Sequence, residues 1–189
     1  HQIWTFDLKQ NEVRPYAGSG REDLVDGPLP RAAFAQPSGL ATDGKTLWVA
    51  DSEISDVRSL ALDGTGEVDT VVGEGLFEFG DRDGQGKDVR LQHALGVAYR
   101  DGKLYVADTY NNKIKVIDPQ KRTCETFKGN SPGWLKGPVF NEPAGLSFAD
   151  DKLYVADTNN HRIRVIDMAT REVSTLNLQG VDPPRLPKK

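Results

Sequence analysis

Short segments in which apolar and polar residues alternate recur along the chain and predict β-strands. Residues 113–117 alternate with period two, and residues 104–107 before them are rich in residue types that favour strands. The dipeptide Asp101-Gly102 precedes residues 104–107 and is typical of a two-residue hairpin turn. Together with strands at 96–99 and 123–127, these segments predict a four-stranded antiparallel unit. No segment has a helical period, and no apolar run approaches the ~20 residues of a membrane span.

This unit is repeated. Residues 153–166 nearly repeat residues 104–117, and residues 47–60 form a third, less regular copy. A glycine stands twelve residues before an aspartate in each copy: Gly39 before Asp51, Gly96 before Asp108, and Gly145 before Asp157. The period from copy to copy is 57 and then 49 residues, so an insertion lies outside this spacing. Repeats of this length with several short strands predict an all-β fold, a β-propeller with one blade per repeat.

The repeat boundaries predict three whole blades and part of a fourth within one propeller domain. Residues 1–7 align with residues 161–167, so we expect the chain to start at the third strand of a blade and to belong to a larger ring. Residues after the last repeat strand are rich in proline, which cannot donate to a ladder, and predict an extended tail. The expected ranges are a half-blade at 1–17, blades at 34–73, 91–128 and 140–179, and the tail at 180–189.

Several motifs resemble the NHL-repeat family. They are Pro37-Ser-Gly-Leu-Ala, Pro143-Ala-Gly-Leu-Ser, and the Val-Ala-Asp-Thr and Asn-His-Arg-Ile elements of the repeats. The resemblance implies a propeller that commonly has six blades, of which this chain would supply about three and a half. The chain departs from the pattern at Ala94, where the other copies have proline, and in the turn at 53–56.

A narrower resemblance concerns segments outside the generic repeat. The Gln-Ile-Trp opening, Phe34-Ala-Gln-Pro-Ser-Gly-Leu, Phe79-Gly-Asp-Arg-Asp-Gly and Leu91-Gln-His-Ala-Leu-Gly-Val are similar to the later blades of proteins that join a thioredoxin-like domain to an NHL propeller. The resemblance implies a thioredoxin-like parent protein. In such a parent, the partners of this chain would include the remaining blades of the ring.

The long links between blades are the candidate interaction surface. In a propeller they lie on the top face, together with the turns between second and third strands, and loops on a rigid scaffold commonly carry binding residues. Most of the insertion falls in the link from Gly73 to Gly96. We expect a protein partner on this face, with aromatic anchors and with charged residues that orient it. The expected anchors are Phe77, Phe79 and Trp134, and the expected orienting residues are Arg82 and Asp83.

The recurring aspartates Asp51, Asp108 and Asp157 have two interpretations. They could form a ring of carboxylates, or each could cap a turn by accepting bonds from amides two or three residues later. We favour structural turn caps, because a repeated residue usually serves the repeated fold.

Catalysis is not favoured. A six-bladed hydrolase of the lactonase or esterase type, with a divalent metal in the channel, is the first alternative function, but it needs inward oxygen ligands from several blades. The expected inner strands at 39–42, 96–99 and 145–148 contain no carboxylate, and the three histidines are dispersed. We therefore expect a non-catalytic interaction or scaffold module with no metal and no cofactor, while an enzyme remains the alternative.

Composition favours a soluble domain and disfavours nucleic acid. With 24 basic and 28 acidic residues the formal net charge is −4 and the pI is about 5.4. Basic and acidic residues alternate in the top links, which gives little attraction for phosphates, so an RNA-binding propeller is the second alternative function. Cys124 is the single cysteine, which excludes an internal disulfide. These features leave the cellular compartment open.

Overall fold

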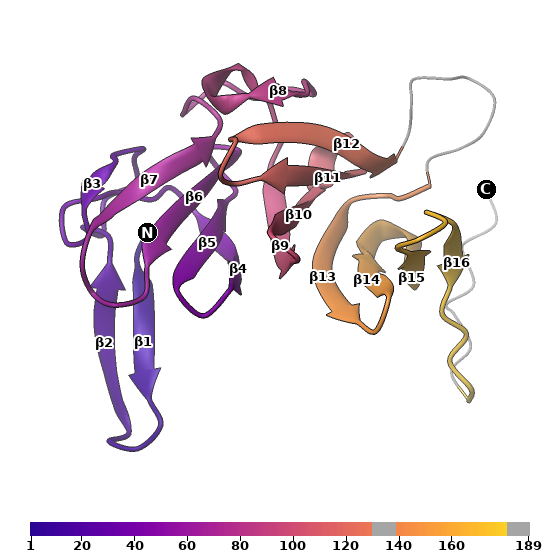
Figure 1. Cartoon of the computed structure of the whole chain (residues 1–189), viewed down its shortest axis with the longest axis horizontal. Helices are drawn as coiled ribbons and strands as arrows, with labels where there is room; N and C mark the ends of the chain where they lie inside the picture. Colours follow the sequence, from indigo (N-terminus) through magenta and orange to yellow (C-terminus); the bar gives the residue numbers. More distant parts are fainter. Residues whose placement is uncertain (130–138, 181–189) are drawn as a thin grey trace.

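The computed structural model describes residues 1–129 and 139–180, whose strands form a hairpin and three blades arranged in an open arc (Figure 1). The hairpin consists of β1 (Ile3–Asp7) and β2 (Glu12–Ala17). The first blade contains β4 (Pro37–Thr42), β5 (Thr46–Asp51), β6 (Asp56–Ala61) and β7 (Glu67–Val72). The second contains β9 (Ala94–Arg100), β10 (Lys103–Asp108), β11 (Lys113–Asp118) and β12 (Thr123–Gly129). The third contains β13 (Pro143–Ala149), β14 (Lys152–Asp157), β15 (Arg162–Asp167) and β16 (Val173–Thr175).

All strand pairs within these sheets are antiparallel, which confirms the predicted four-stranded blades. Two blades carry a short fifth strand that the repeat pattern did not predict. The strand β3 (Gly27–Pro28) pairs with β7, and β8 (Gly84–Gln85) pairs with β12. Each belongs to the link that precedes its blade, so the link runs to the outer edge of the blade before it returns to the innermost strand. Three single-turn 3-10 helices complete the described elements: η1 (Gly86–Asp88), η2 (Thr109–Asn111) and η3 (Thr158–Asn160).

The innermost strands β4, β9 and β13 pack side by side at the centre of the arc, and glycine makes this possible. A Cβ atom at Gly39 would lie 2.5 Å from the carbonyl oxygen of Leu95 in the next blade. At Gly96 it would overlap the carbonyl oxygen of Ala144. At the equivalent Gly145, the atom nearest to such a Cβ would be in the Ala156 side chain, at 3.6 Å. The glycine of the repeat is therefore needed where a following blade packs against its strand.

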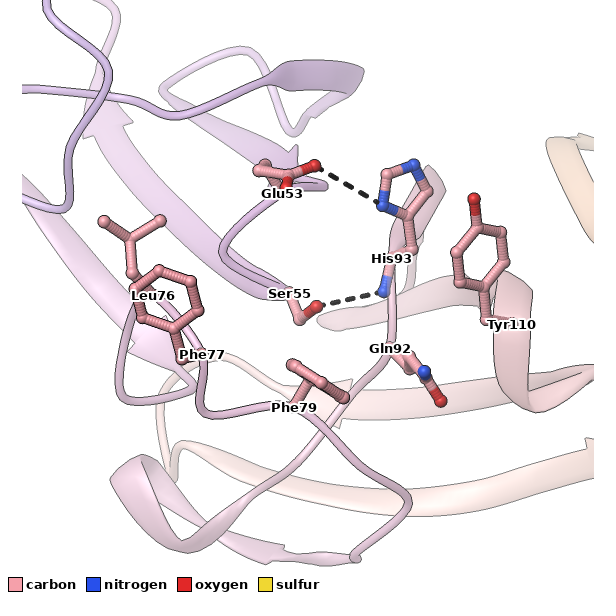
Figure 2. Close-up of a pocket in the computed structure, with 8 residues that line it drawn as sticks. All are labelled: Glu53, Ser55, Leu76, Phe77, Phe79, Gln92, His93 and Tyr110. Atoms are coloured by element: carbon pink, nitrogen blue, oxygen red, sulfur yellow. Dashed lines mark hydrogen bonds and ion pairs between the residues drawn. The ribbon is translucent and has the colours of Figure 1, made fainter.

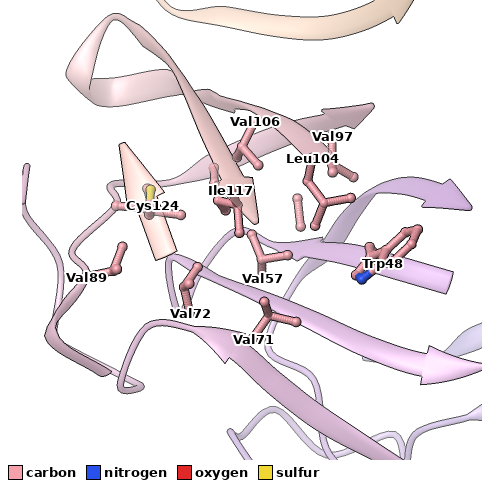
Figure 3. Close-up of a cluster of buried hydrophobic side chains, with 13 residues drawn as sticks. Trp48, Val57, Val71, Val72, Val89, Val97, Leu104, Val106, Ile117 and Cys124 are labelled. Atoms are coloured by element: carbon pink, nitrogen blue, oxygen red, sulfur yellow. The ribbon is translucent and has the colours of Figure 1, made fainter. Parts of the chain in front are cut away.

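Apolar side chains fill the spaces between blades. The cluster in Figure 3 lies between the first and second blades, with Trp48 at one end and Cys124 at the other. Because side chains alternate along a strand, Leu104 and Val106 join this cluster, while Tyr105 between them packs edge-on against Phe148 of the third blade. The second blade thus has two buried faces. No helix in residues 1–129 or 139–180 is long and apolar enough to cross a membrane.

A buried cation ties the first link to the first blade. The guanidinium of Arg58 on β6 is fully buried and donates to Asp26 at 2.6 Å and to the carbonyl oxygen of Ala33 at 3.1 Å. Asp26 also accepts bonds from the amide and hydroxyl of Thr70 on β7. A charge can be buried only when it is paired and hydrogen-bonded, so Arg58 fixes the path of the link over the top of its blade.

The second blade repeats this arrangement with lysine. The buried ammonium of Lys115 donates to Asp81 at 2.8 Å and to Asp83 at 2.6 Å, both in the link that precedes the blade. Asp83 also accepts from the amide and hydroxyl of Thr126, and Asp81 pairs with Lys113. The lysines lower the pKa values of both carboxyls against the opposing effect of partial burial. The link is thereby held to the second blade at Asp81 and Asp83, directly after the segment that carries Phe77 and Phe79.

The repeated aspartates are structural, but the amides they bind differ from those expected. They are fully buried, and the backbone amides that donate to their carboxylates belong to the link fifteen or sixteen residues earlier, not to the turn that follows. The reason is topological, because the end of the second strand lies beside the entry to the innermost strand. The donors are the amides of Ala35 and Gln36 to Asp51, of Gln92 to Asp108, and of Asn141 to Asp157. Asp108 and Asp157 also accept a bond from the side-chain amide of the asparagine three residues later, Asn111 and Asn160.

The first prediction concerns the glycine contact. We expect Gly96→Ala to lower the free energy of unfolding by about 1–3 kcal/mol or more, because the new Cβ overlaps a backbone oxygen that cannot move without displacing β13. Gly145→Ala is the matched control, since it adds the same atom at the same repeat position where there is room. Denaturant titration of both variants measures the difference. Equal losses for the two variants would show that the inner strands do not set this requirement.

Asp56 on β6 is a buried carboxyl whose two oxygens have no hydrogen-bond partner within the described residues. Burial raises its pKa to about 8, with the charge of Arg58 acting in the opposite direction. In the unfolded chain the same group titrates near its ordinary value. Between these two values the folded state therefore holds a proton that the unfolded state releases, and Asp56 reduces stability as the pH rises.

We expect Asp56→Asn to remove this dependence. From about pH 5 to about pH 7, the free energy of unfolding of the variant relative to the unmodified chain should increase by up to about 1.4 kcal/mol per pH unit. Comparing the two proteins cancels the contributions of the other titrating groups. Denaturant titrations across this pH range measure the effect. A constant difference between the two proteins would contradict a raised pKa at Asp56.

Candidate interaction site

A cavity of about 200 Å³ opens between the first and second blades, on the face that carries the links (Figure 2). One side is formed by the turn that follows β5, another by the link after β7, and a third by the entry to β9 and the turn that follows β10. The lining residues are Glu53, Ser55, Leu76, Phe77, Phe79, Gln92, His93 and Tyr110. Residues from two blades thus form one concave surface.

Phe77 is held in an unusual conformation. The amide of Glu78 donates to the carbonyl oxygen of Gly75 at 3.1 Å, which closes a four-residue turn with Phe77 at its third position. Its φ of 71° lies in the left-handed region, where turns normally place glycine or asparagine. The side chain is 87% exposed. Phe77 therefore carries backbone strain and gains little from burial in return.

Arg90 fixes the ends of this turn. Its guanidinium donates to Glu74 at 2.5 Å and to Glu78 at 3.1 Å, one carboxylate on each side of Phe77. The same side chain also donates to the carbonyl oxygens of Lys87 and Val89. Arg90 thus donates to four acceptors and ties the turn to the backbone at residues 87–89. The position of Phe77 is therefore restrained.

The opposite side of the cavity is formed by the second blade. The imidazole of His93 stacks on Tyr110 with ring centroids 4.5 Å apart and an interplanar angle of 11°. Its backbone amide donates to the hydroxyl of Ser55 at 3.0 Å, which ties the two blades together. The carboxylate of Glu53 lies 3.9 Å from Nδ1 of His93, which is too far for a hydrogen bond. In Figure 2 the carboxylate of Glu53 points toward His93 at the margin of the cavity that both residues line.

The expected interaction residues fall into three groups. Phe77 and Phe79 both line the cavity, and Phe79 is 58% exposed. Arg82 and Asp83 lie outside it: Arg82 donates through Nε to the carbonyl oxygen of Asp88, and Asp83 is bound to Lys115. Trp134 lies outside the described residues. Interaction through any of the five remains a prediction, and the geometry brings only the two phenylalanines together.

Sequence reasoning missed the polar and aromatic residues contributed by other segments. The only available signal was departure from the repeat. Tyr110 stands where the third blade has Asn159, and His93 stands where it has Glu142. Glu53 lies in the turn at 53–56, which departs from the repeat pattern.

Residues 1–129 and 139–180 contain no group of three or more His, Cys, Asp or Glu side chains placed to hold a metal ion. Cys124 is buried, and burial raises the pKa of its thiol to about 12. A thiol in that environment stays protonated and is a poor nucleophile. The two histidines outside the cavity, His1 and His161, do not contact it.

We expect Arg90→Ala to loosen the Phe77 turn without unfolding the blade. The carboxylates of Glu74 and Glu78 face solvent, and ion pairs with a solvated partner contribute about 0.2–1 kcal/mol each, so the global loss should remain small. Hydrogen exchange of the Glu78 and Gly80 amides should accelerate, because these amides close the turn and its exit. Arg82→Ala, which removes one bond in the same link, serves as the control. Unchanged exchange in the Arg90 variant would mean that the turn is held by its backbone alone.

Comparison with known proteins places the chain among repeat proteins. The NHL repeat family model matches residues 91–117 and 140–166, which are parts of the second and third blades. The chain is 42% identical to the protein SUPPRESSOR OF QUENCHING 1, chloroplastic, from Arabidopsis thaliana, over 97% of the chain and 19% of that protein. It is 45% identical to NHL repeat-containing protein 2 from Bos taurus, over 68% of the chain and 21% of that protein. The chain therefore spans about one fifth of the length of these relatives.

Solved structures show the same fold at low sequence identity. An auxiliary nutrient binding protein from Bacteroides thetaiotaomicron aligns with a TM-score of 0.69 and 16% identity, over 92% of this chain and 43% of that one. Virginiamycin B lyase from Staphylococcus aureus aligns with a TM-score of 0.59 and 14% identity, over 94% of this chain and 49% of that one. These likenesses show the β-propeller fold alone. The matched repeats and the curated relatives show that the chain belongs to the NHL-repeat family.

Proposed function

We propose that the chain is a non-catalytic protein-interaction module whose binding surface is the cavity between the first and second blades. The observation that carries this proposal is Phe77, an aromatic residue at positive φ whose side chain is almost wholly exposed. Such a backbone conformation costs on the order of 1–3 kcal/mol for a residue other than glycine. In the folded chain, burial of the Phe77 ring does not offset this cost. A partner that covers the ring would offset it.

The surroundings of Phe77 support a protein ligand. Interfaces commonly have a central aromatic anchor that lies next to polar groups. Phe79 and Tyr110 extend the exposed aromatic surface, and Glu53 and Gln92 supply polar groups at its margin. A volume of about 200 Å³ is smaller than the usual pocket for a drug-sized ligand, and it suits one inserted side chain.

We further propose that the chain works inside a larger protein. The resemblance of segments such as Phe79-Gly-Asp-Arg-Asp-Gly to thioredoxin-like NHL proteins supports such a parent, and the greater length of the relatives is consistent with it. The free space beside Gly145 supports packing of a further blade against β13. The remaining blades of the propeller are then a second partner, separate from the one bound on top.

The prediction that tests the interaction role replaces Phe77 with glycine. We expect Phe77→Gly to leave the melting temperature unchanged or raise it, because glycine adopts the turn conformation without strain. Partner binding should fall about tenfold or more, which is the usual effect of losing an anchor. Asn11→Gly, another left-handed residue, in the β1–β2 turn, is the matched control and should leave binding unchanged. The measurement is quantitative recovery of bound proteins from an extract of the source organism, beside thermal unfolding.

Two outcomes would decide against the proposal. If Phe77→Gly binds partners as well as the unmodified chain, the cavity is not the interaction surface. If the variant unfolds at a lower temperature, Phe77 serves the fold. The alternatives make different predictions for the same protein: a hydrolase would turn over lactones or esters with a bound divalent metal, and an RNA-binding propeller would retain RNA with a steep dependence on salt.

A further inference from the structure

The walls of the cavity differ in chemistry, and the difference specifies its occupant. In Figure 2, Phe77 and the imidazole of His93 stand on opposite sides, Phe79 lies below the opening, and Glu53 lies above it. Aromatic faces carry negative electrostatic potential. A carboxylate adds a full negative charge beside them. The apolar walls and the carboxylate would therefore both favour a cation that has flat, weakly hydrated surfaces.

The charge of the surrounding segments has the same sign. Three carboxylates, those of Glu53, Glu74 and Glu78, lie in the segments 53–55 and 74–80, and the guanidinium of Arg90 contacts two of them. Arg90 already binds Glu74 and Glu78, so its charge is satisfied beneath the turn. Within residues 1–129 and 139–180, Glu53 has only the long contact to His93. The unsatisfied negative charge therefore lies at the cavity itself, where a phosphate or an acidic side chain would be repelled.

We propose that the cavity binds an arginine side chain of a protein partner. The guanidinium would stack between Phe77 and His93 and donate its paired N–H groups to the carboxylate of Glu53. Arginine suits this geometry better than lysine, because its planar group stacks on aromatic rings and offers two parallel donors to one carboxylate. This inference rests on the interaction role proposed above and names the chemical group that the partner inserts.

The test uses small probes, so it does not depend on knowing the partner. The probes are Nα-acetyl-arginine N-methylamide, the citrulline compound of the same shape without charge, and the corresponding lysine compound. Each is titrated into the 15N-labelled chain, and amide shifts of Ser55, Glu78, Gly80 and His93 are followed. We expect saturable shifts with the arginine probe, and binding at least about tenfold weaker with citrulline.

Variants locate the contacts. Glu53→Gln and Phe77→Leu should each weaken binding of the arginine probe severalfold, and both change side chains that are exposed, so the spectrum should otherwise remain that of the folded chain. Glu125→Gln removes an exposed carboxylate from β12, outside the cavity lining, and should have no effect. Added salt should weaken the arginine probe more than the citrulline probe.

Each contrary result has a distinct meaning. Equal binding of arginine and citrulline, tighter binding of lysine, or no saturable shift with any probe would overturn the arginine assignment. None of these results would touch the effect of Phe77→Gly on partner recovery, which tests the interaction role itself. Conversely, arginine binding that is insensitive to Glu53→Gln and Phe77→Leu would place the guanidinium elsewhere and overturn the assignment.

Discussion

The arc of blades depends on how closely the backbones of neighbouring inner strands approach. At Gly39 and Gly96 a carbonyl oxygen of the next blade occupies the space that a Cβ atom would need. This approach brings β4, β9 and β13 together at the centre, and the wider outer parts of the blades are then separated by layers of apolar side chains such as the cluster around Trp48 and Ile117. The same arrangement directs the links that precede the first and second blades, and the turns between second and third strands, to one face, which is where residues from two blades can meet.

Buried cations extend this order from the blades to the links. Arg58 and Lys115 occupy the same repeat position, and each draws an aspartate from the preceding link onto the blade. The carboxylate and the threonine that it binds recur with the cation, as Asp26 with Thr70 and Asp83 with Thr126. Removing one partner would leave a charge without compensation in the interior, a large cost. The link from Gly73 to Gly96 is therefore held to its blade at Asp81 and Asp83, while Phe77 and Phe79 before them line the cavity.

The sequence predicted what the repeat determines and little of what lies between repeats. Spacing alone placed the strands, the glycines and the structural aspartates, because each repeats with the fold. It assigned the wrong backbone amides to Asp51 and its equivalents, since the true backbone donors become neighbours only when the sheet forms. For the same reason, no sequence pattern indicated that Asp83, in a long link, binds Lys115. Its role toward a partner stays a prediction. The strain at Phe77 has no signature in residue type or spacing.

The candidate site is formed by side chains that do not repeat, held by backbone contacts that do. Residues that repeat are committed to the fold: the third blade keeps an amide contact to its neighbour through Glu142 and Asn112, just as the second does through His93 and Ser55. The backbone bond is retained while the side chain is free to differ, so a binding group can be introduced at no cost to the blade interface. His93 is such a substitution, and Tyr110 stacks upon it. In a repeat protein, the backbone contacts that hold neighbouring blades together are thus the same ones that place non-repeating side chains opposite each other, and this is how Glu53, Phe77 and His93 come to share one cavity.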